Sequence, residues 1–477
     1  RAPVVIAHET RSQRAFLVLT GGSGRRSMSC RFNLENDIAS GGRRFDVIAL
    51  NRKRILVAAA VLFLAPCLAW SSGFALFEVG ARTAGMAGTM VAIGDDPSTL
   101  FWNPAGMAFQ TDEGIQLMVG TSIIEPEQDF VGDSPYPGAG YTGSQVQQTF
   151  FTPHIFLGIP INDRLEVSFS FFNPYGLGTE WEEDFLGNYI AQKSDLMVFD
   201  LGASMAYRIS ENFAFGLGVD YMTATLELTQ QVGLINPFNQ QLTTVAESHL
   251  ESEGLSSAWA WNAGILWKMG GGFSFGASYR SEFTINGDGK AMFTQVPTGY
   301  PEFDGLLGTF LPFDEKLPIE SSIAFPDFWN VGLAWQNEKW TFSGQYGVQG
   351  WSVYESLPII FPENPEFSTI REEAWEDAAQ WRVGIELRAT QRWDLRLGYL
   401  EDETPQPAWG MSPLLGDSDR VSYMGGIGYH TDRFRFDIAY EHVVLKERST
   451  EGQNPDGFNG TYEGESPLLH VSLTFKI

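Results

Sequence analysis

Five of the six histidines in this chain lie beyond residue 72, and histidine is the side chain best suited to acid–base chemistry near neutral pH. Nucleophilic catalysis also needs a nucleophile and a third group that orients the base. None of the five stands in a recognisable catalytic motif, so an enzyme is the function class with the least support. They are His154, His249, His430, His442 and His470.

Metal and redox chemistry has equally little support. Both cysteines, Cys30 and Cys67, precede Gly73, so the chain after them has no thiol and no cysteine metal ligand. Acidic residues such as Glu372-Glu373 and Glu376-Asp377 offer oxygen atoms to a divalent cation, but solvated loop charge is the simpler interpretation. We expect no metal ion and no cofactor.

Charge is divided unevenly along the chain. Residues 1–54 hold eleven Lys and Arg against four Asp and Glu, whereas the remainder holds 20 against 54. A surface this acidic repels phosphate backbones, and nucleic acid is therefore excluded as a partner.

A segment typical of a secretory signal begins at residue 51. The basic run Asn51-Arg52-Lys53-Arg54 precedes the unbroken apolar run 55–64, and small residues follow at Ala69 and Ser71. The apolar run is too short for a membrane-spanning helix. We expect an upstream segment 1–50 outside the mature protein, a signal peptide 51–71, and a mature chain that starts at Ser72 or Gly73. Alternatively, 1–50 is a basic tail removed with the signal.

From Gly114 onward, apolar residues recur at every second position, which predicts β-strands. The mean hydropathy of −0.12 is too low for a bundle of membrane helices. A membrane barrel accommodates it, because each strand alternates lipid-facing apolar residues with polar residues that face the lumen.

The connections between these segments alternate strictly between short and long. Six are tight polar turns, at 162–163, 210–212, 270–272, 336–338, 390–392 and 431–432. Seven are long, near 125–146, 173–195, 229–255, 293–320, 354–375, 402–418 and 448–462. Thirteen connections join fourteen strands, and the alternation places all long loops on one rim. The sequence therefore predicts an all-β fold, a transmembrane antiparallel barrel of about 14 strands over 114–477, in the bacterial outer membrane. A soluble all-β protein has no reason to segregate its loops.

The segment 72–113 precedes the first strand and lacks strand alternation. It is rich in small residues, among them Gly80, Ala81, Ala84 and Gly85. Fourteen strands enclose an open lumen unless something fills it. We therefore expect this segment to fold inside the barrel as a plug.

Several short motifs stand out along the chain. The most specific are Gly73-Phe74-Ala75-Leu76, Gly94-Asp95-Asp96 and Asn103-Pro104-Ala105-Gly106. Further motifs are 173–180, Tyr279-Arg280-Ser281-Glu282 and Pro326-Asp327-Phe328-Trp329. With these motifs the chain resembles the FadL-like family of outer-membrane transporters for long-chain fatty acids and aromatic hydrocarbons, and the resemblance covers nearly all of 73–477. It implies fourteen strands, a hatch that plugs the lumen, and diffusion of ligand without energy input. It assigns Gly73, Phe74, Asp95, Asp96, Asn103, Pro104 and Ala105 to the hatch.

The third barrel segment is interrupted. Residues 165–172 alternate as a strand and run into Asn173-Pro174-Tyr175-Gly176. Proline cannot donate to a ladder and glycine weakens it, so such residues mark bulges or breaks that can leave a hole in the wall. In the family an inward kink of the third strand forms a lateral exit, and the resemblance assigns Asn173, Pro174, Tyr175 and Gly176 to this gate. Alternatively, they begin an ordinary loop.

The long connection 293–320 contains apolar residues at the spacing of one helix face, namely Phe303, Leu306, Leu307, Phe310 and Leu311. On a long loop such a face needs a partner, which is either another loop or a ligand. In the family a groove among extracellular loops captures the substrate first. Two interpretations of this apolar face therefore remain, a ligand capture groove and a lid that packs on the barrel.

A ligand carboxylate would favour a basic partner in the lumen. The fifth barrel strand and its exit, 219–233, contain no Lys or Arg, which favours a neutral hydrocarbon over a fatty acid. Arg280 and Lys316 are the possible polar contacts for a ligand.

These expectations together describe passive transport of hydrophobic molecules across the outer membrane. The steps are capture at extracellular loops, binding in the barrel, hatch rearrangement and lateral release. The alternatives are a general porin for small solutes and, with less support, an outer-membrane lipid-modifying enzyme. The expected partners are a hydrophobic small molecule and the surrounding lipids and lipopolysaccharide, and we expect a monomer.

Overall fold

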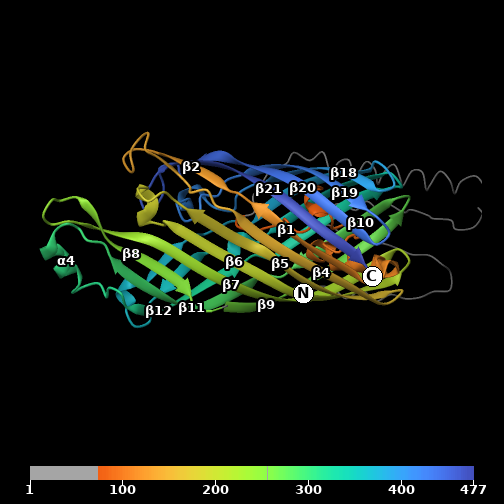
Figure 1. Ribbon diagram of the computed structural model, residues 1–477, viewed down its shortest axis with the longest axis horizontal. Helices are drawn as coiled ribbons and strands as arrows, with labels where there is room; N and C mark the ends of the chain where they lie inside the picture. Colours follow the sequence, from red (N-terminus) through yellow and green to blue (C-terminus); the bar gives the residue numbers. More distant parts are fainter. Residues whose placement is uncertain (1–72, 255) are drawn as a thin grey trace, which may run out of the picture. The chain divides into compact units, whose positions relative to one another are not determined.

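Fourteen antiparallel strands close into a barrel in the computed structural model, which describes residues 73–254 and 256–477 (Figure 1). The expected upstream segment and signal peptide lie outside the described residues. In order around the barrel, the strands are β1 (Gln116–Ile124), β4 (Phe150–Asn162), β5 (Leu165–Glu180), β6 (Lys193–Ser210), β7 (Phe213–Ile235), β9 (Ser256–Gly270), β10 (Phe273–Arg280), β13 (Phe328–Gln336), β14 (Trp340–Gln349), β17 (Ala378–Arg388), β18 (Trp393–Asp402), β19 (Arg420–His430), β20 (Phe434–Ser449) and β21 (Gly460–Lys476). The barrel closes because β21 pairs with β1 from Gln116↔Lys476 to Ile124↔Leu468. The predicted fold is confirmed.

Alternation along the strands creates an apolar outer face. On β6, Leu201 and Met205 are about half exposed, whereas the adjacent residues Asp200 and Ala206 are buried. Exposed apolar side chains at alternate positions on neighbouring strands suit contact with lipid rather than water. No helix in the described part of the chain is long and apolar enough to cross a membrane.

All six predicted tight turns join consecutive barrel strands on one rim, and the seven long connections emerge on the other. Several long connections contain strands that were expected to be loops. These are β2 (Glu127–Gly132), β3 (Thr142–Ser144), β8 (Leu242–Ser252), β11 (Phe283–Gln295), β12 (Lys316–Phe325), β15 (Ser356–Ile360) and β16 (Thr369–Glu372). The last five pair in sequence beyond the barrel, because Leu250, Phe293, Leu317 and Ile319 share a small apolar core.

Residues 73–113, called the hatch segment below, lie inside the barrel as short helices joined by turns (Figure 1). Its elements are α2 (Ala81–Ala84), α3 (Thr99–Trp102), η1 (Pro104–Phe109) and η2 (Thr111–Glu113). Met86, Met90, Ile93 and Trp102 are all at most 1% exposed. The large side chains of the hatch segment therefore form part of the main apolar core of the barrel.

Candidate functional site

Asn103 fastens the end of the hatch segment to the wall. Its amide nitrogen donates to the carbonyl of Val91, at 2.7 Å, and to the carbonyl of Ile265 on β9, at 2.9 Å. Its oxygen accepts from the backbone nitrogen of Ala105, at 3.1 Å, which caps η1. The Asn-Pro-Ala motif thus starts a helical turn and bonds the hatch segment to a strand.

Glycines of the wall allow the backbone of the hatch segment to approach closely. A β-carbon at Gly216 would lie 2.5 Å from the backbone nitrogen of Ala105, and one at Gly398 would lie 2.5 Å from that of Ala87. Real β-carbons do not approach backbone atoms this closely, so any larger residue would displace the hatch segment or the strand. Gly276 and Gly384 are in the same situation, whereas a β-carbon at Gly264 would meet the side chain of Asn103.

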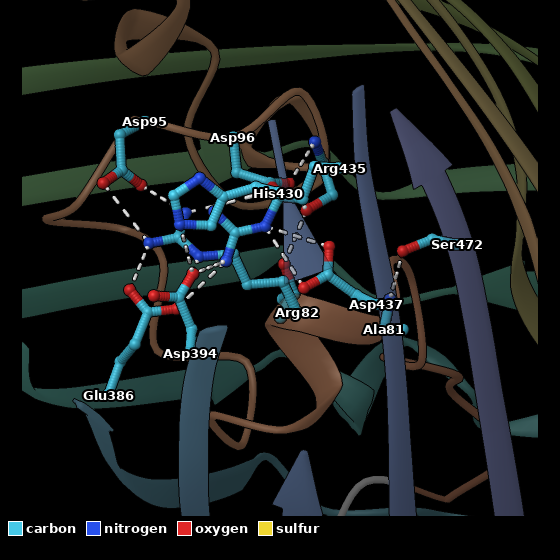
Figure 2. A network of polar contacts seen from close by, with 12 residues as sticks. Ala81, Arg82, Asp95, Asp96, Glu386, Asp394, His430, Arg435, Asp437 and Ser472 are labelled. Carbon is cyan, nitrogen blue, oxygen red and sulfur yellow. Dashed lines mark hydrogen bonds and ion pairs between the residues drawn. The ribbon is translucent and has the colours of Figure 1, made fainter. Parts of the chain in front are cut away.

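A buried ionic network joins the hatch segment to the wall near the short-turn rim (Figure 2). Arg82, on α2, pairs with Asp95, at 2.5 Å, and with Glu386 on β17, at 2.9 Å. Glu386 also pairs with Arg396, at 2.6 Å. Arg435 continues the network to Asp394, at 2.8 Å, and to Asp437, at 3.0 Å. We call these seven residues the hatch network.

The pKa values of the two predicted hatch aspartates shift in opposite directions because their partners differ. Burial opposes the ionisation of Asp95, but the charge and hydrogen bond of Arg82 outweigh it and lower the pKa of Asp95. Asp96 is 2% exposed, and burial raises its pKa although Ser98 donates to it. Asp95 is therefore the ionic partner of Arg82, whereas Asp96 organises the turn that precedes α3.

Two hatch residues bond to opposite sides of the seam between β1 and β21. The hydroxyl of Ser122 on β1 donates to the carbonyl of Glu78, at 2.7 Å. The backbone nitrogen of Ala81 donates to the hydroxyl of Ser472 on β21, at 3.2 Å.

The start of the hatch segment pairs with a free edge of β5. The backbone nitrogen of Leu76 donates to the carbonyl of Pro174, at 2.8 Å, and that of Gly176 donates to the carbonyl of Phe74, at 3.1 Å. Ala75 and Tyr175 thus form an antiparallel bridge. The hatch segment occupies the edge that a neighbouring strand would otherwise use.

That edge is free because β5 separates from β4. Their ladder ends at Ile155↔Phe171, although β5 continues to Glu180 and β4 begins at Phe150. Towards β6 a bulge leaves Asn173 and Pro174 outside the register between Phe172↔Asp200 and Tyr175↔Val198. The interruption expected from the sequence is therefore a break within a strand, and the loop begins only after Glu180.

Two apolar side chains cover this separation. The ring of Phe150 lies on the bare face of Gly178, where a β-carbon would be 2.0 Å from the ring. Leu76 lies against Gly176 in the same way, at 3.0 Å. Above them the backbone nitrogen of Val146 donates to the carbonyl of Glu180, at 2.7 Å. The unpaired region is thus bounded by bonds on both sides and filled by side chains.

A cavity of about 410 Å³ adjoins the separation. We call it the lateral cavity; its lining includes residues 73–76 and 78 of the hatch segment, 150–152 of β4, 173 and 175–179 of β5, 195–197 of β6, and 415–417 with Arg420 on the long-loop side. This volume lies within the range of about 300–1,000 Å³ that is common for ligand sites. The predicted gate residues Asn173, Tyr175 and Gly176 line it together with Gly73 and Phe74.

The two predicted polar contacts do not meet in this cavity. Arg280 is buried and pairs with Asp200, at 2.8 Å, and with Asp220, at 2.9 Å. Lys316 is exposed and pairs with Glu251, at 3.6 Å. Neither side chain lines the lateral cavity.

The predicted apolar face of the long loop is divided in the structure. The helix α4 spans Pro301–Leu307, so Phe310 and Leu311 lie beyond its end. Phe303 and Leu307 are buried against Val245 and Ala246 of β8, with Leu311 packed at the edge of this cluster. Leu306 and Phe310 are 50% and 69% exposed. The inner part packs on β8, and the outer part is exposed.

Pro153 is a residue of this site that sequence reasoning missed. It lies in β4 opposite Thr121 of β1, just beyond the last residue that pairs with β5. Proline cannot donate a ladder bond, so each of the separating strands carries one, Pro153 and Pro174. Both prolines are visible in the sequence, but only the strand pairing shows that each lies beyond the point where the ladder between β4 and β5 ends.

Comparison with known proteins agrees with this architecture. A family model described as "Outer membrane protein transport protein (OMPP1/FadL/TodX)" matches residues 62–476. The long-chain fatty acid transport protein of Escherichia coli O6:H1 is 25% identical over 429 residues, which are 85% of this chain and 95% of that protein. Outer membrane protein P1 of Haemophilus influenzae is 23% identical over 459 residues, 87% and 96% of the two chains.

Two solved structures are similar over nearly their whole length. A FadL homologue of Pseudomonas aeruginosa has a TM-score of 0.74 at 19% identity and covers 85% of this chain and 100% of its own. The toluene transporter TodX of P. putida has a TM-score of 0.64 at 16% identity, with coverage of 84% and 99%. At these identities the likeness establishes the fold.

Proposed function

This chain belongs to the outer membrane protein transport protein family (OMPP1/FadL/TodX), and on that premise we propose that it carries hydrophobic molecules across the outer membrane without an energy source. One relative bears the name of a long-chain fatty acid transporter, and one solved neighbour that of a toluene transporter. In outer-membrane barrels short turns face the periplasm and long loops face outward. The lateral cavity then lies towards the cell exterior from the hatch network.

The observation that carries the proposal is the separation of β4 from β5 beside the lateral cavity. A hydrophobic molecule gains roughly 25 cal/mol for each Å² of apolar surface kept out of water. Release into the periplasm would forfeit that gain, whereas release through the wall into lipid would retain it. We propose that a ligand captured at the long loops enters the lateral cavity and leaves between β4 and β5.

The hatch segment supports this route over that of a general porin. A porin needs an open lumen, whereas here large hatch side chains are buried in the barrel core. Phe74, Ala75 and Leu76 also line the lateral cavity and bond to the edge of β5. In our proposal, rearrangement of these first hatch residues frees the edge while Asn103 and the hatch network hold the rest.

The test restores the ladder at the separation. The double variant Pro153→Val and Pro174→Val supplies one backbone donor on each strand, so β4 and β5 can pair further. We expect uptake of a hydrophobic tracer by cells to fall, while the purified variant still binds the tracer. Pro160→Val is the matched control, because Pro160 lies in the same strand within the paired region. Unchanged uptake by a correctly folded double variant would refute lateral release.

A further inference from the structure

Negative charge dominates the lining of the ligand cavities. The lateral cavity is lined by the carboxylates of Glu78, Glu127, Asp195, Asp417 and Glu465, with Arg420 as its one basic side chain. Three smaller cavities in the described part of the chain share lining residues with it and contain Glu227, Glu251, Asp288 and Glu373, but no Lys, Arg or His. The rest of these linings is mainly aliphatic and aromatic.

The single cation of the lateral cavity has one carboxylate partner at close range. The Nε of Arg420 pairs with a carboxylate oxygen of Asp402, at 3.0 Å, whereas its Nη2 has no hydrogen-bond partner among the described residues. Asp417 and Glu78 line the same cavity. Three carboxyl groups therefore lie near the one guanidinium that lines this cavity.

The buried Arg280 also has carboxylate partners at close range. It forms ion pairs with both Asp200 and Asp220, and Asp220 also accepts from the amide of Asn262, at 2.8 Å. Its guanidinium lies over the rings of Phe101 and Phe172, at 5.5 and 5.4 Å from their centroids. A cation with two carboxylate partners offers little attraction to a third.

We infer that the route selects uncharged molecules and rejects carboxylates of the same shape, a specificity that rests on the proposed transport function. A ligand carboxylate in the lateral cavity would leave water and meet like charges, and both effects disfavour its ionised form. The carboxyl group of Glu78, in the hatch segment, already experiences both effects, because burial and the charge of nearby Glu441 raise its pKa.

The first test compares hexadecanol with hexadecanoate, which differ at the head group, on the purified full-length protein. At about pH 8 the acid is ionised in solution, and we expect it to bind at least about tenfold more weakly than the alcohol, equivalent to a shift of one pKa unit. Acidification to about pH 5 should narrow the difference, because both the ligand and the cavity carboxyls gain protons. Equal affinities at about pH 8 would overturn the inference alone. Binding of neither compound would overturn the proposed function and the inference with it.

The second test changes the charges. Asp417→Asn with Glu78→Gln makes the lateral cavity less negative, and Asp195→Asn with Glu465→Gln does so at two other lining carboxylates. Each pair should raise the affinity for hexadecanoate while that for hexadecanol stays constant. Glu211→Gln, in the short turn between β6 and β7, makes a charge change outside the linings of these four cavities and should alter neither affinity. Arg420→Gln should not weaken hexadecanoate binding. A loss of that binding would identify Arg420 as a carboxylate site and overturn the inference.

Discussion

The carbonyl oxygen of Val91, in the hatch segment, stands 1.8 Å from the position that a β-carbon of Gly276 would occupy on β10. The neighbouring atoms are also backbone atoms, the carbonyl carbon of Val91 at 2.5 Å and Cα of Ala92 at 2.9 Å. A flexible side chain could move away from a new methyl group, but this backbone cannot do so without shifting the hatch segment.

We therefore expect Gly276→Ala to displace the hatch segment at an overpacking cost of about 1–3 kcal/mol. The displacement should appear as increased conductance of the folded barrel in planar bilayers. Gly425→Ala on β19 is the matched control, since its β-carbon would have no atom within 4 Å. If both variants conduct as little as the parent protein, close packing at Gly276 does not hold the hatch segment in place.

Arg82→Met should weaken the attachment of the hatch segment to β17, which depends on the ion pair between Arg82 and Glu386. Removal of one partner from a buried ion pair costs about 3–5 kcal/mol, and the cost here is smaller because Asp95 is 45% exposed. Glu386 keeps Arg396 as a partner. We expect faster proteolysis of residues 82–96 from the short-turn side in reconstituted vesicles. Lys476→Met, which breaks the surface pair with Glu113, should have little effect. Equal proteolysis of both variants would contradict a role of the hatch network in holding the segment.

The loop before β17 should become more stable as the pH falls. Burial raises the pKa of Glu373 from its ordinary value of 4.5 to about 7, although Arg371 opposes the shift. The folded loop therefore binds a proton that the unfolded loop releases between these values. Lowering the pH through 7 towards 4.5 adds stability, at most about 3 kcal/mol. Hydrogen exchange of residues 351–377, corrected for intrinsic rates, should show this gain, and Glu373→Gln should abolish its pH dependence. Equal protection of the loop amides at about pH 5 and about pH 8, which lie below and above the raised pKa of Glu373, would be inconsistent with that shift.

N-terminal sequencing of outer-membrane material should begin at Ser72 or Gly73. The basic run 51–54, the apolar run 55–64 and the small residues at 69 and 71 motivate this expectation. Residues 1–50 still attached to the isolated barrel would contradict it.

Local signals predicted the barrel well. Tight turns such as the one after Asn162 depend on a few adjacent residues, and strict alternation depends on residues two apart, so strand number and loop placement were accessible. Asn103 was assigned to the hatch because the motif Asn103-Pro104-Ala105-Gly106 resembles that of a known family, and its hydrogen bond with Ala105 lies within this motif.

Contacts between distant residues were not accessible. Arg82 and Glu386 are 304 positions apart, and nothing near either residue indicates the other. The lumen-facing glycines interrupt strands without any local sign of what approaches them. The strands β8 and β11 were expected to be loops, since their apolar residues become a core only when the two pair.

The bonds from Ser122 to Glu78 and from Ala81 to Ser472 place the hatch segment across the seam between the first and the last strand. β1 and β21 are the first and the last barrel strands in the sequence. The ladder between them closes the sheet into a barrel. A segment bonded to both edges therefore ties the two ends of the sheet together from inside. The ladder that closes the wall encloses a lumen that the hatch segment occupies.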